Sequence, residues 1–262
     1  MMKRTLALLL VLVMVLSLLP VGVLAEAGEY APLAEHTNEG HICEQCETTA
    51  EWTVWDGTTA MTDGGHYVLE AGVTLSAPVA LSAGTYTLCL NGQTITGSTT
   101  LFDLSGTASL IITDCTAKTE EGGYKAGTLT GATTSAVRAA EEAAFTMYDG
   151  IFTGNTNTSE ATTEGGGAVN ASGNAVIKLL GGQLRGNTSA KYGGAVFARN
   201  YSTVTLQNML VTGNQSPIAS ALYGTGGAKY TLKDTEVSGN TGTNTDKWTN
   251  HRIVAQVHIC IH

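Results

Sequence analysis

The sequence predicts an all-β protein that winds into a single-stranded right-handed parallel β-helix, a solenoid of about six coils. Three observations predict this fold: the composition, a repeat of nearly constant length, and apolar residues that alternate within each repeat. Of the 262 residues, 32 are glycines and only 13% are charged. Such a chain, which is also rich in Thr, favours short strands joined by tight turns over helices.

A Gly-Asn pair closes each of the four clearest repeats. In every copy the asparagine lies 19 residues after an alanine that an apolar residue follows. Successive asparagines are 32, 27 and 26 residues apart, and they are Asn155, Asn187, Asn214 and Asn240. Only the loop between an asparagine and the next such alanine varies in length. The remainder of each repeat therefore behaves as one structural unit.

Apolar residues recur nine, eleven and sixteen positions after each of these alanines. The first two positions are two residues apart, which is typical of a strand with one buried face. The third position and the residues around the alanine mark two further short strands. Three strands in about 26 residues correspond to one coil of a parallel β-helix, in which stacked coils build one continuous core.

Fainter repeats precede these four and set the expected boundaries. Tyr67 and Leu69 alternate in the first of them, so we expect the parallel β-helix to occupy residues 65–240. An N-terminal Cys- and His-containing segment and cap is expected over 26–64. A C-terminal cap strand or irregular tail is expected over 241–262.

The four asparagines are predicted to form a structural column. The glycine before each of them allows the positive φ that a tight corner needs. Asparagine side chains at equivalent corners can pass amide hydrogen bonds from coil to coil, as they do in stacked strands. The recurring Gly-Asn pair is therefore interpreted as a feature of the fold rather than a catalytic site.

Residues 1–25 have the pattern of a secretory signal peptide. Lys3 and Arg4 precede an apolar run that Pro20 ends, and small residues follow at a cleavage site. Cleavage changes the net charge from −9 to −11, because it removes Lys3 and Arg4 and leaves 22 acidic and 11 basic residues. We expect a secreted or cell-surface protein with no transmembrane segment after signal cleavage. Its acidity gives little attraction for nucleic acid.

Two motifs carry a resemblance to known families. GGAV (166–169 and 193–196) and FTGN (152–155) resemble the GGA[ILV] and FxxN repeats of chlamydial polymorphic membrane proteins. Roughly residues 52–240, including LCLNGQTITG (88–97), are similar to secreted right-handed β-helix repeat proteins of gut Firmicutes. The resemblance implies a pectate-lyase-like architecture and an adhesin-like role, in which the chain contacts extracellular glycans or host and neighbouring-cell surface proteins.

A carbohydrate-active enzyme, such as a polysaccharide lyase, is the alternative function. Calcium-assisted elimination needs an acidic cluster for the metal and a basic side chain. The basic candidates on the middle coils are Arg185, Lys191 and Arg199. No acidic cluster accompanies them in the sequence, and Asp149 has no carboxylate in its column on the adjacent coil. The sequence therefore favours a non-enzymatic protein that needs no cofactor.

The segment HTNEGHICEQC (36–46) leaves two interpretations open. His36, His41, Cys43 and Cys46 are residue types that bind zinc. A second CxxC or a downstream His pair, which would strengthen a zinc motif, is missing. A local disulfide between the two cysteines fits an exported chain equally well.

The other cysteines also leave alternatives open. Cys89 and Cys115 are 26 residues apart, about one coil, so that they either form a disulfide or remain buried thiols. In the tail VHICIH (257–262), apolar residues alternate with His258, Cys260 and His262. The tail is interpreted as a cap strand, as a His-Cys-His metal face, or as truncated or out-of-frame sequence.

Overall fold

The computed structural model describes residues 42–43, 48–49, 51–120, 123–243, 251–253 and 257–260. Every described residue belongs to the compact unit Pro32–His262. The predicted signal peptide lies outside these residues. Strands and turns make up the described part, which contains no helix. Accordingly, none of the described residues belongs to a helix that could cross a bilayer.

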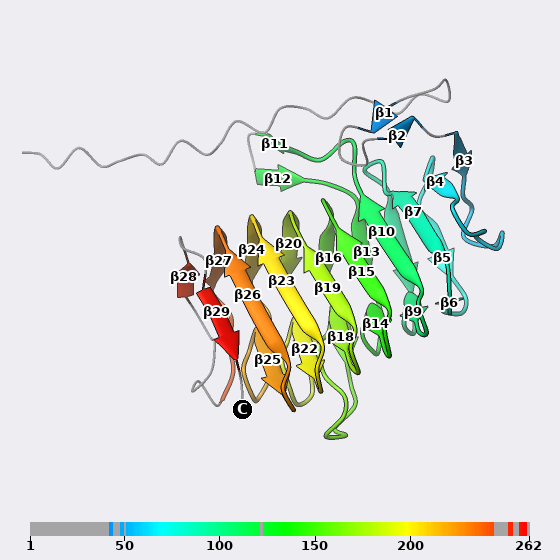
Figure 1. Cartoon of the computed structure of the whole chain (residues 1–262). Helices are drawn as coiled ribbons and strands as arrows, with labels where there is room; N and C mark the ends of the chain where they lie inside the picture. The colour runs from blue at the N-terminus through cyan, green and yellow to red at the C-terminus, as the bar shows by residue number, and fades with distance from the viewer. Residues whose placement is uncertain are drawn as a thin grey trace, which may run out of the picture. The chain divides into compact units, whose positions relative to one another are not determined.

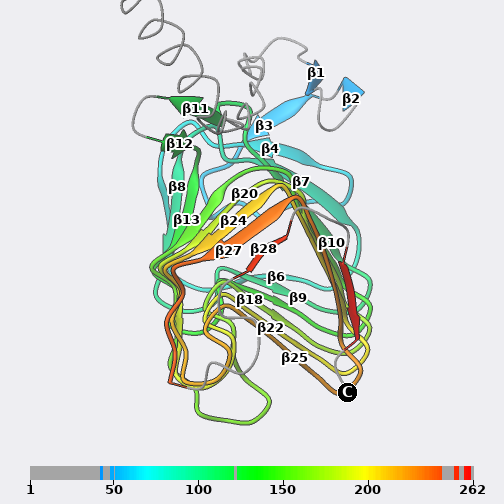
Figure 2. The ribbon, with the colours of Figure 1, turned by 90° about the vertical axis from the view of Figure 1, so that its left-hand side faces the viewer.

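Three parallel sheets form the wall of a solenoid, and Figure 2 shows each coil passing through them in turn. The first sheet contains β3 (Trp52–Val54), β4 (His66–Val68), β7 (Thr85–Cys89), β10 (Ser109–Thr113), β15 (Ala144–Met147), β19 (Val176–Leu179), β23 (Thr203–Gln207) and β26 (Lys229–Lys233). The second contains β5 (Val73–Leu75), β8 (Thr94–Gly97), β13 (Thr128–Thr130), β16 (Ile151–Thr153), β20 (Gly182–Arg185), β24 (Met209–Thr212) and β27 (Thr235–Ser238). The third contains β6 (Val79–Leu81), β9 (Phe102–Leu104), β14 (Val137–Ala139), β18 (Val169–Ala171), β22 (Val196–Arg199) and β25 (Leu222–Thr225).

The predicted parallel β-solenoid is confirmed, with about seven coils where six were expected (Figure 1). The first complete coil is β4–β5–β6, and the last described one is β26–β27. Pairing begins earlier than the expected Gly65, because β3 pairs in parallel with β4 through Trp52 and His66. This strand spans three residues, too few to show an alternating pattern in the sequence.

The apolar columns of the repeat build the core. Phe145 lies opposite Ile177 on the neighbouring strand, and Val204 and Tyr230 continue the same line. All four side chains are at most 4% exposed. A second column runs parallel to it through Met147, Leu179, Leu206 and Leu232. Stacking like residues in register removes a continuous apolar surface from water, which no single coil could do alone.

The Gly-Gly-Ala corners are a steric requirement of the solenoid. A Cβ on Gly194 would overlap the carbonyl oxygen of Ser220 and lie 2.6 Å from the backbone N and O of Gln215. A Cβ on Gly167 would lie 2.7 Å from two carbonyl oxygens of neighbouring segments. Backbones of successive coils thus approach too closely for a side chain, which explains why this motif recurs.

Short strands also occur outside the parallel pairing of the three sheets, some before or within the coils and some after the last coil. β1 (Ile42–Cys43) pairs with β2 (Thr48–Thr49), and β11 (Lys118–Glu120) pairs with β12 (Gly123–Lys125), both in antiparallel fashion. Near the C-terminus, β28 (His251–Ile253) and β29 (Val257–Cys260) pair antiparallel with β27 and β26. Their backbones therefore end the parallel pairing of two sheets. The His-Cys-His metal face predicted for the tail depends on side chains outside the described part, so it stays a prediction.

Candidate functional site

Four asparagine side chains form a hydrogen-bonded ladder at the corner that follows the second sheet. The Nδ2 of Asn155 donates to the Oδ1 of Asn187 at 3.0 Å, Asn187 donates likewise to Asn214 at 3.0 Å, and Asn214 to Asn240 at 2.9 Å. Each Nδ2 also donates to a carbonyl oxygen of the preceding coil. All four side chains are at most 3% exposed, so the ladder satisfies polar groups that burial would otherwise leave unpaired.

The ladder fixes the residues that come directly after it. Thr188, Gln215 and Thr241 each follow one of these asparagines, and they form successive parallel bridges with one another. One coil earlier, β17 (Thr156–Asn157) pairs in parallel with β21 (Thr188–Ser189). A fourth, short column of residues therefore continues the coil-to-coil register outside the three main sheets.

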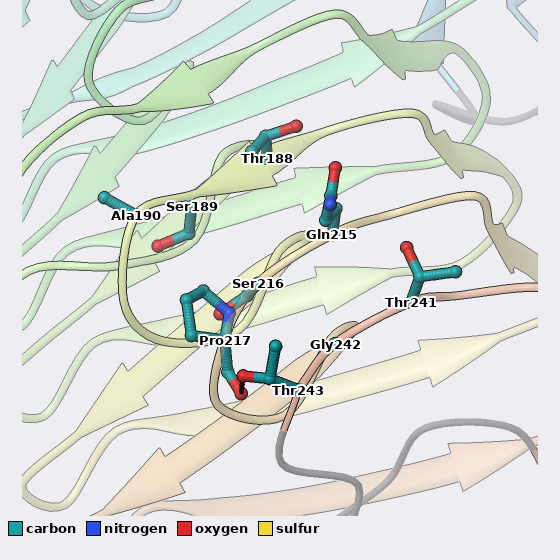
Figure 3. Close-up of a pocket in the computed structure, with 9 residues that line it drawn as sticks. All are labelled: Thr188, Ser189, Ala190, Gln215, Ser216, Pro217, Thr241, Gly242 and Thr243. Atoms are coloured by element: carbon teal, nitrogen blue, oxygen red, sulfur yellow. Dashed lines mark hydrogen bonds between the residues drawn. The ribbon is translucent and has the colours of Figure 1, made fainter.

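This column lines a groove of about 480 Å³. Figure 3 shows Thr188, Gln215 and Thr241 in a row, each from a successive coil. The other lining residues are small or uncharged, and they are Ser189, Ala190, Ser216, Pro217, Gly242 and Thr243. Within the described part of the chain, the side chains of the three row residues have no hydrogen-bond partner. Hydroxyl and amide groups both donate and accept hydrogen bonds, so the row is an uncharged surface that can do both. We call Thr188, Gln215 and Thr241 the groove row.

An aromatic cluster lies on the loop and strands beside the groove. The rings of Tyr192 and Tyr223 stack with centroids 4.7 Å apart and planes 14° from parallel, and Phe197 stacks on both at 5.7 and 5.8 Å. The Nζ of Lys191 lies 5.3 Å from the centre of the Tyr192 ring. Burial, and then the neighbouring Tyr192, raise the pKa of Tyr223. Ser216, in the groove, donates to the carbonyl of Lys191 at 2.9 Å, which ties the loop to the groove.

The three basic candidates lie on separate elements. Arg185 ends β20 on the outside of the second sheet, and Arg199 ends β22 in the third. Lys191 lies in the loop between them, where its Nζ donates to the carbonyl of Glu160 at 2.9 Å. The described residues contain no group of three or more His, Cys, Asp and Glu side chains that could hold a metal ion. Among the described residues, no such metal-holding group therefore lies beside any of these bases.

The buried carboxylates have structural partners. Asp149 accepts a hydrogen bond from the hydroxyl of Tyr124 at 2.8 Å. Asp114 accepts from the backbone N–H groups of Gly92, Thr116 and Gly127 and from the Thr116 hydroxyl. Both side chains are fully buried. These contacts hold the insertion that contains β11 and β12 against neighbouring coils.

The structure describes only some of the candidate cysteine and histidine residues. His36, His41 and Cys46 lie outside the described residues, and Cys43 ends the short strand β1. The proposed zinc site or local disulfide in this segment stays a prediction. Cys89 and Cys115 lie side by side on adjacent coils, with 3.3 Å between their sulfur atoms, and both are thiols in this structure.

Sequence reasoning missed the groove and the aromatic cluster. The groove row combines two threonines and a glutamine, so no residue type repeats. Its positional signal was nevertheless present, because each member follows a ladder asparagine. Phe197 and Tyr223 share an offset in the repeat and lie opposite each other, whereas Tyr192 comes from the loop whose length varies.

Together these features define the class of protein: a three-sheet parallel β-solenoid in which an asparagine ladder supports an uncharged groove. Comparisons with protein-family models, with curated proteins and with solved structures find no match for this chain.

Proposed function

We propose that this chain is an exported, non-enzymatic β-helix repeat protein whose groove contacts extracellular glycans. The observation that supports the proposal is the groove row. Its three side chains are uncharged, stand in register on successive coils, and have no hydrogen-bond partner within the described residues. A glycan presents many neutral hydroxyl groups, and side chains that both donate and accept hydrogen bonds are suited to them.

The geometry of the row favours an extended ligand. Neighbouring parallel strands are about 4.8 Å apart, so the three side chains span two such steps along the solenoid axis. Ligand sites generally combine a few convergent polar groups with apolar or aromatic surface. Tyr192, on the loop that leads away from the groove, stacks on Tyr223 of β25, and the two rings provide aromatic surface.

Export and surface contact form the second part of the proposal. The pattern of residues 1–25 supports export, either into the medium or to the cell surface. The resemblance of the GGAV and FTGN motifs to secreted and chlamydial β-helix repeats supports an adhesin-like role. Host or neighbouring-cell surface proteins are the other partner class that this resemblance implies.

A glycan array incubated with the purified protein tests this function. We expect binding to uncharged glycans, with no release of unsaturated sugars from pectins, alginates or glycosaminoglycans. If no glycan on the array binds and a pulldown captures a cell-surface protein, the partner is a protein rather than a glycan. Release of unsaturated sugars that Arg185→Ala or Arg199→Ala abolishes would instead establish the alternative, a polysaccharide lyase.

A further inference from the structure

Cys89 and Cys115 form a buried sulfur pair that joins two coils. Cys89 ends β7, in the second coil, and Cys115 comes shortly after β10, in the third. Their Sγ atoms are 3.3 Å apart, and the two residues are 0% and 3% exposed. The pair therefore has the proximity that a covalent link between neighbouring coils requires.

The pair lies on the outer face of the first sheet, apart from the solenoid core. Leu88 belongs to the core, and the alternation of side chains along a strand directs Cys89 to the opposite face. There Cys89 and Cys115 cluster with Val68, and Trp52 packs against them. Because core side chains are not part of this cluster, the two sulfurs can approach each other without disturbing the core.

We infer that Cys89 and Cys115 are an oxidation site, at which the exported protein forms a disulfide that ties the second coil to the third. A disulfide bond is about 2.05 Å long, so the sulfurs must approach by about 1.2 Å from their present 3.3 Å. The inference rests on the export proposed above, because disulfides form and persist in oxidising environments. It does not depend on what the groove binds.

The oxidant is a small-molecule or protein disulfide. One cysteine loses its proton, and its thiolate attacks a sulfur of the oxidant, whose S–S bond breaks and releases a thiol. The second cysteine, also deprotonated, then attacks the mixed disulfide and releases the other half of the oxidant as a thiol. Two protein thiols and one oxidant disulfide thus give one protein disulfide and two oxidant thiols.

The surroundings of the pair determine when this reaction is fast. Burial raises the pKa of the Cys89 thiol far above its ordinary value, and the hydrogen bond with Cys115 raises it further. Since the thiolate is the reacting form, exchange is slow once Trp52 covers the cluster. The disulfide therefore forms while the N-terminal coils assemble, and in the folded protein it is protected from reductants.

Peptide mapping after refolding with oxidised and reduced glutathione tests the link. A protease that cleaves before aspartate separates Cys89, in fragment 63–102, from Cys115, in fragment 114–148, and both from Cys43 and Cys46. We expect these two fragments to be joined without reductant and separate with it. Recovery of both cysteines as free, alkylatable thiols after refolding would overturn the inference.

Thermal unfolding of the unaltered protein provides a second readout, for which two cysteine variants serve as controls. Reductant present during refolding should lower the unfolding midpoint of the protein by roughly 5–10 °C, because the link no longer restricts the unfolded chain. The same shift should persist in Cys43→Ser/Cys46→Ser and vanish in Cys89→Ala. A shift that disappears in the first variant would assign the effect to the N-terminal cysteines and overturn the inference.

Discussion

Asn187 and Asn214 lie on adjacent coils and share two hydrogen bonds, because the Nδ2 and the backbone N–H of Asn187 both donate to the Oδ1 of Asn214 at 3.0 Å. The Nδ2 of Asn187 also donates to the carbonyl oxygen of Phe152, on the preceding coil, at 3.0 Å. One side chain therefore connects three successive coils. The ladder closes the corner of the solenoid where the backbone pairing of the second sheet ends.

Asn187→Ala and Asn214→Ala should each lower the free energy of unfolding by about 1–3 kcal/mol, since each leaves two buried N–H groups of the preceding coil without an acceptor. Asn155→Ala is the matched control and should cost less, because within the described part of the chain its Oδ1 accepts one hydrogen bond, from the backbone N–H of Ala132. Urea unfolding measures all three. Equal and near-zero effects would show that the ladder contributes nothing to stability.

The double variant of Asn187 and Asn214 should cost less than the sum of the single changes, because the residues are in contact.

Gly194→Ala should lower the free energy of unfolding by about 2 kcal/mol or more, because the new Cβ would overlap backbone atoms of Ser220 and Gln215. Gly72→Ala is the control: the nearest atom to its Cβ would be the carbonyl oxygen of Thr94, at 3.5 Å. It should change stability by less than about 0.5 kcal/mol. Chemical unfolding of both variants gives the comparison, and a tolerated Gly194→Ala would contradict the steric explanation of the Gly-Gly-Ala motif.

Asp114→Asn should destabilise the protein by about 1–3 kcal/mol. The amide replaces one carboxylate oxygen by a donor, and this donor then faces the N–H groups of Gly127 or Thr116. Asp103→Asn removes a charge from the outside of the third sheet, where no hydrogen bond of the side chain is described, and should have a smaller effect. If thermal unfolding of the two variants were indistinguishable, Asp114 would not organise the insertion.

The carboxyl group of Asp56 should titrate with a pKa of about 2. The backbone N–H of Thr59, followed by the N–H and hydroxyl of Thr58, donates to it and stabilises the charged form. A lowered pKa contributes stability that is fully present above the unfolded value of 3.8 and lost as the pH falls through about 2. Carboxyl chemical shifts in an NMR pH titration measure this directly. A midpoint near 3.8 would mean that the turn is not formed.

The repeat was predictable where like residues recur at fixed offsets. The ladder asparagines and the column of Phe145, Ile177 and Val204 are such cases, because stacking in register requires the same residue type or size on each coil. Trp52 was missed as the first residue of the parallel pairing, since three residues show no period. Gly194 was visible as part of a motif, but its steric reason depends on backbones that are distant in sequence.

The groove could not be derived from residue types. Thr188 and Gln215 have different side chains, and what they share is a position after the ladder and a surface without competing partners. A groove depends on how the loops beyond that position fold, and these loops vary in length between repeats. The neighbouring sulfurs of Cys89 and Cys115 were anticipated only as one of two alternatives, because a spacing of one coil does not fix the direction of the side chains.

Glycan binding by two matched triple variants tests the central claim most directly. Thr188→Ala/Gln215→Ala/Thr241→Ala removes the groove row, and Thr74→Ala/Thr96→Ala/Thr130→Ala removes three hydroxyls that stand in register on the second sheet. We expect the first variant to lose at least about tenfold in affinity, equivalent to about 1.4 kcal/mol, with an unchanged unfolding midpoint. The second should bind like the unaltered protein. Unchanged binding by the groove variant, or an equal loss in both, would contradict the assignment of glycan contact to the groove.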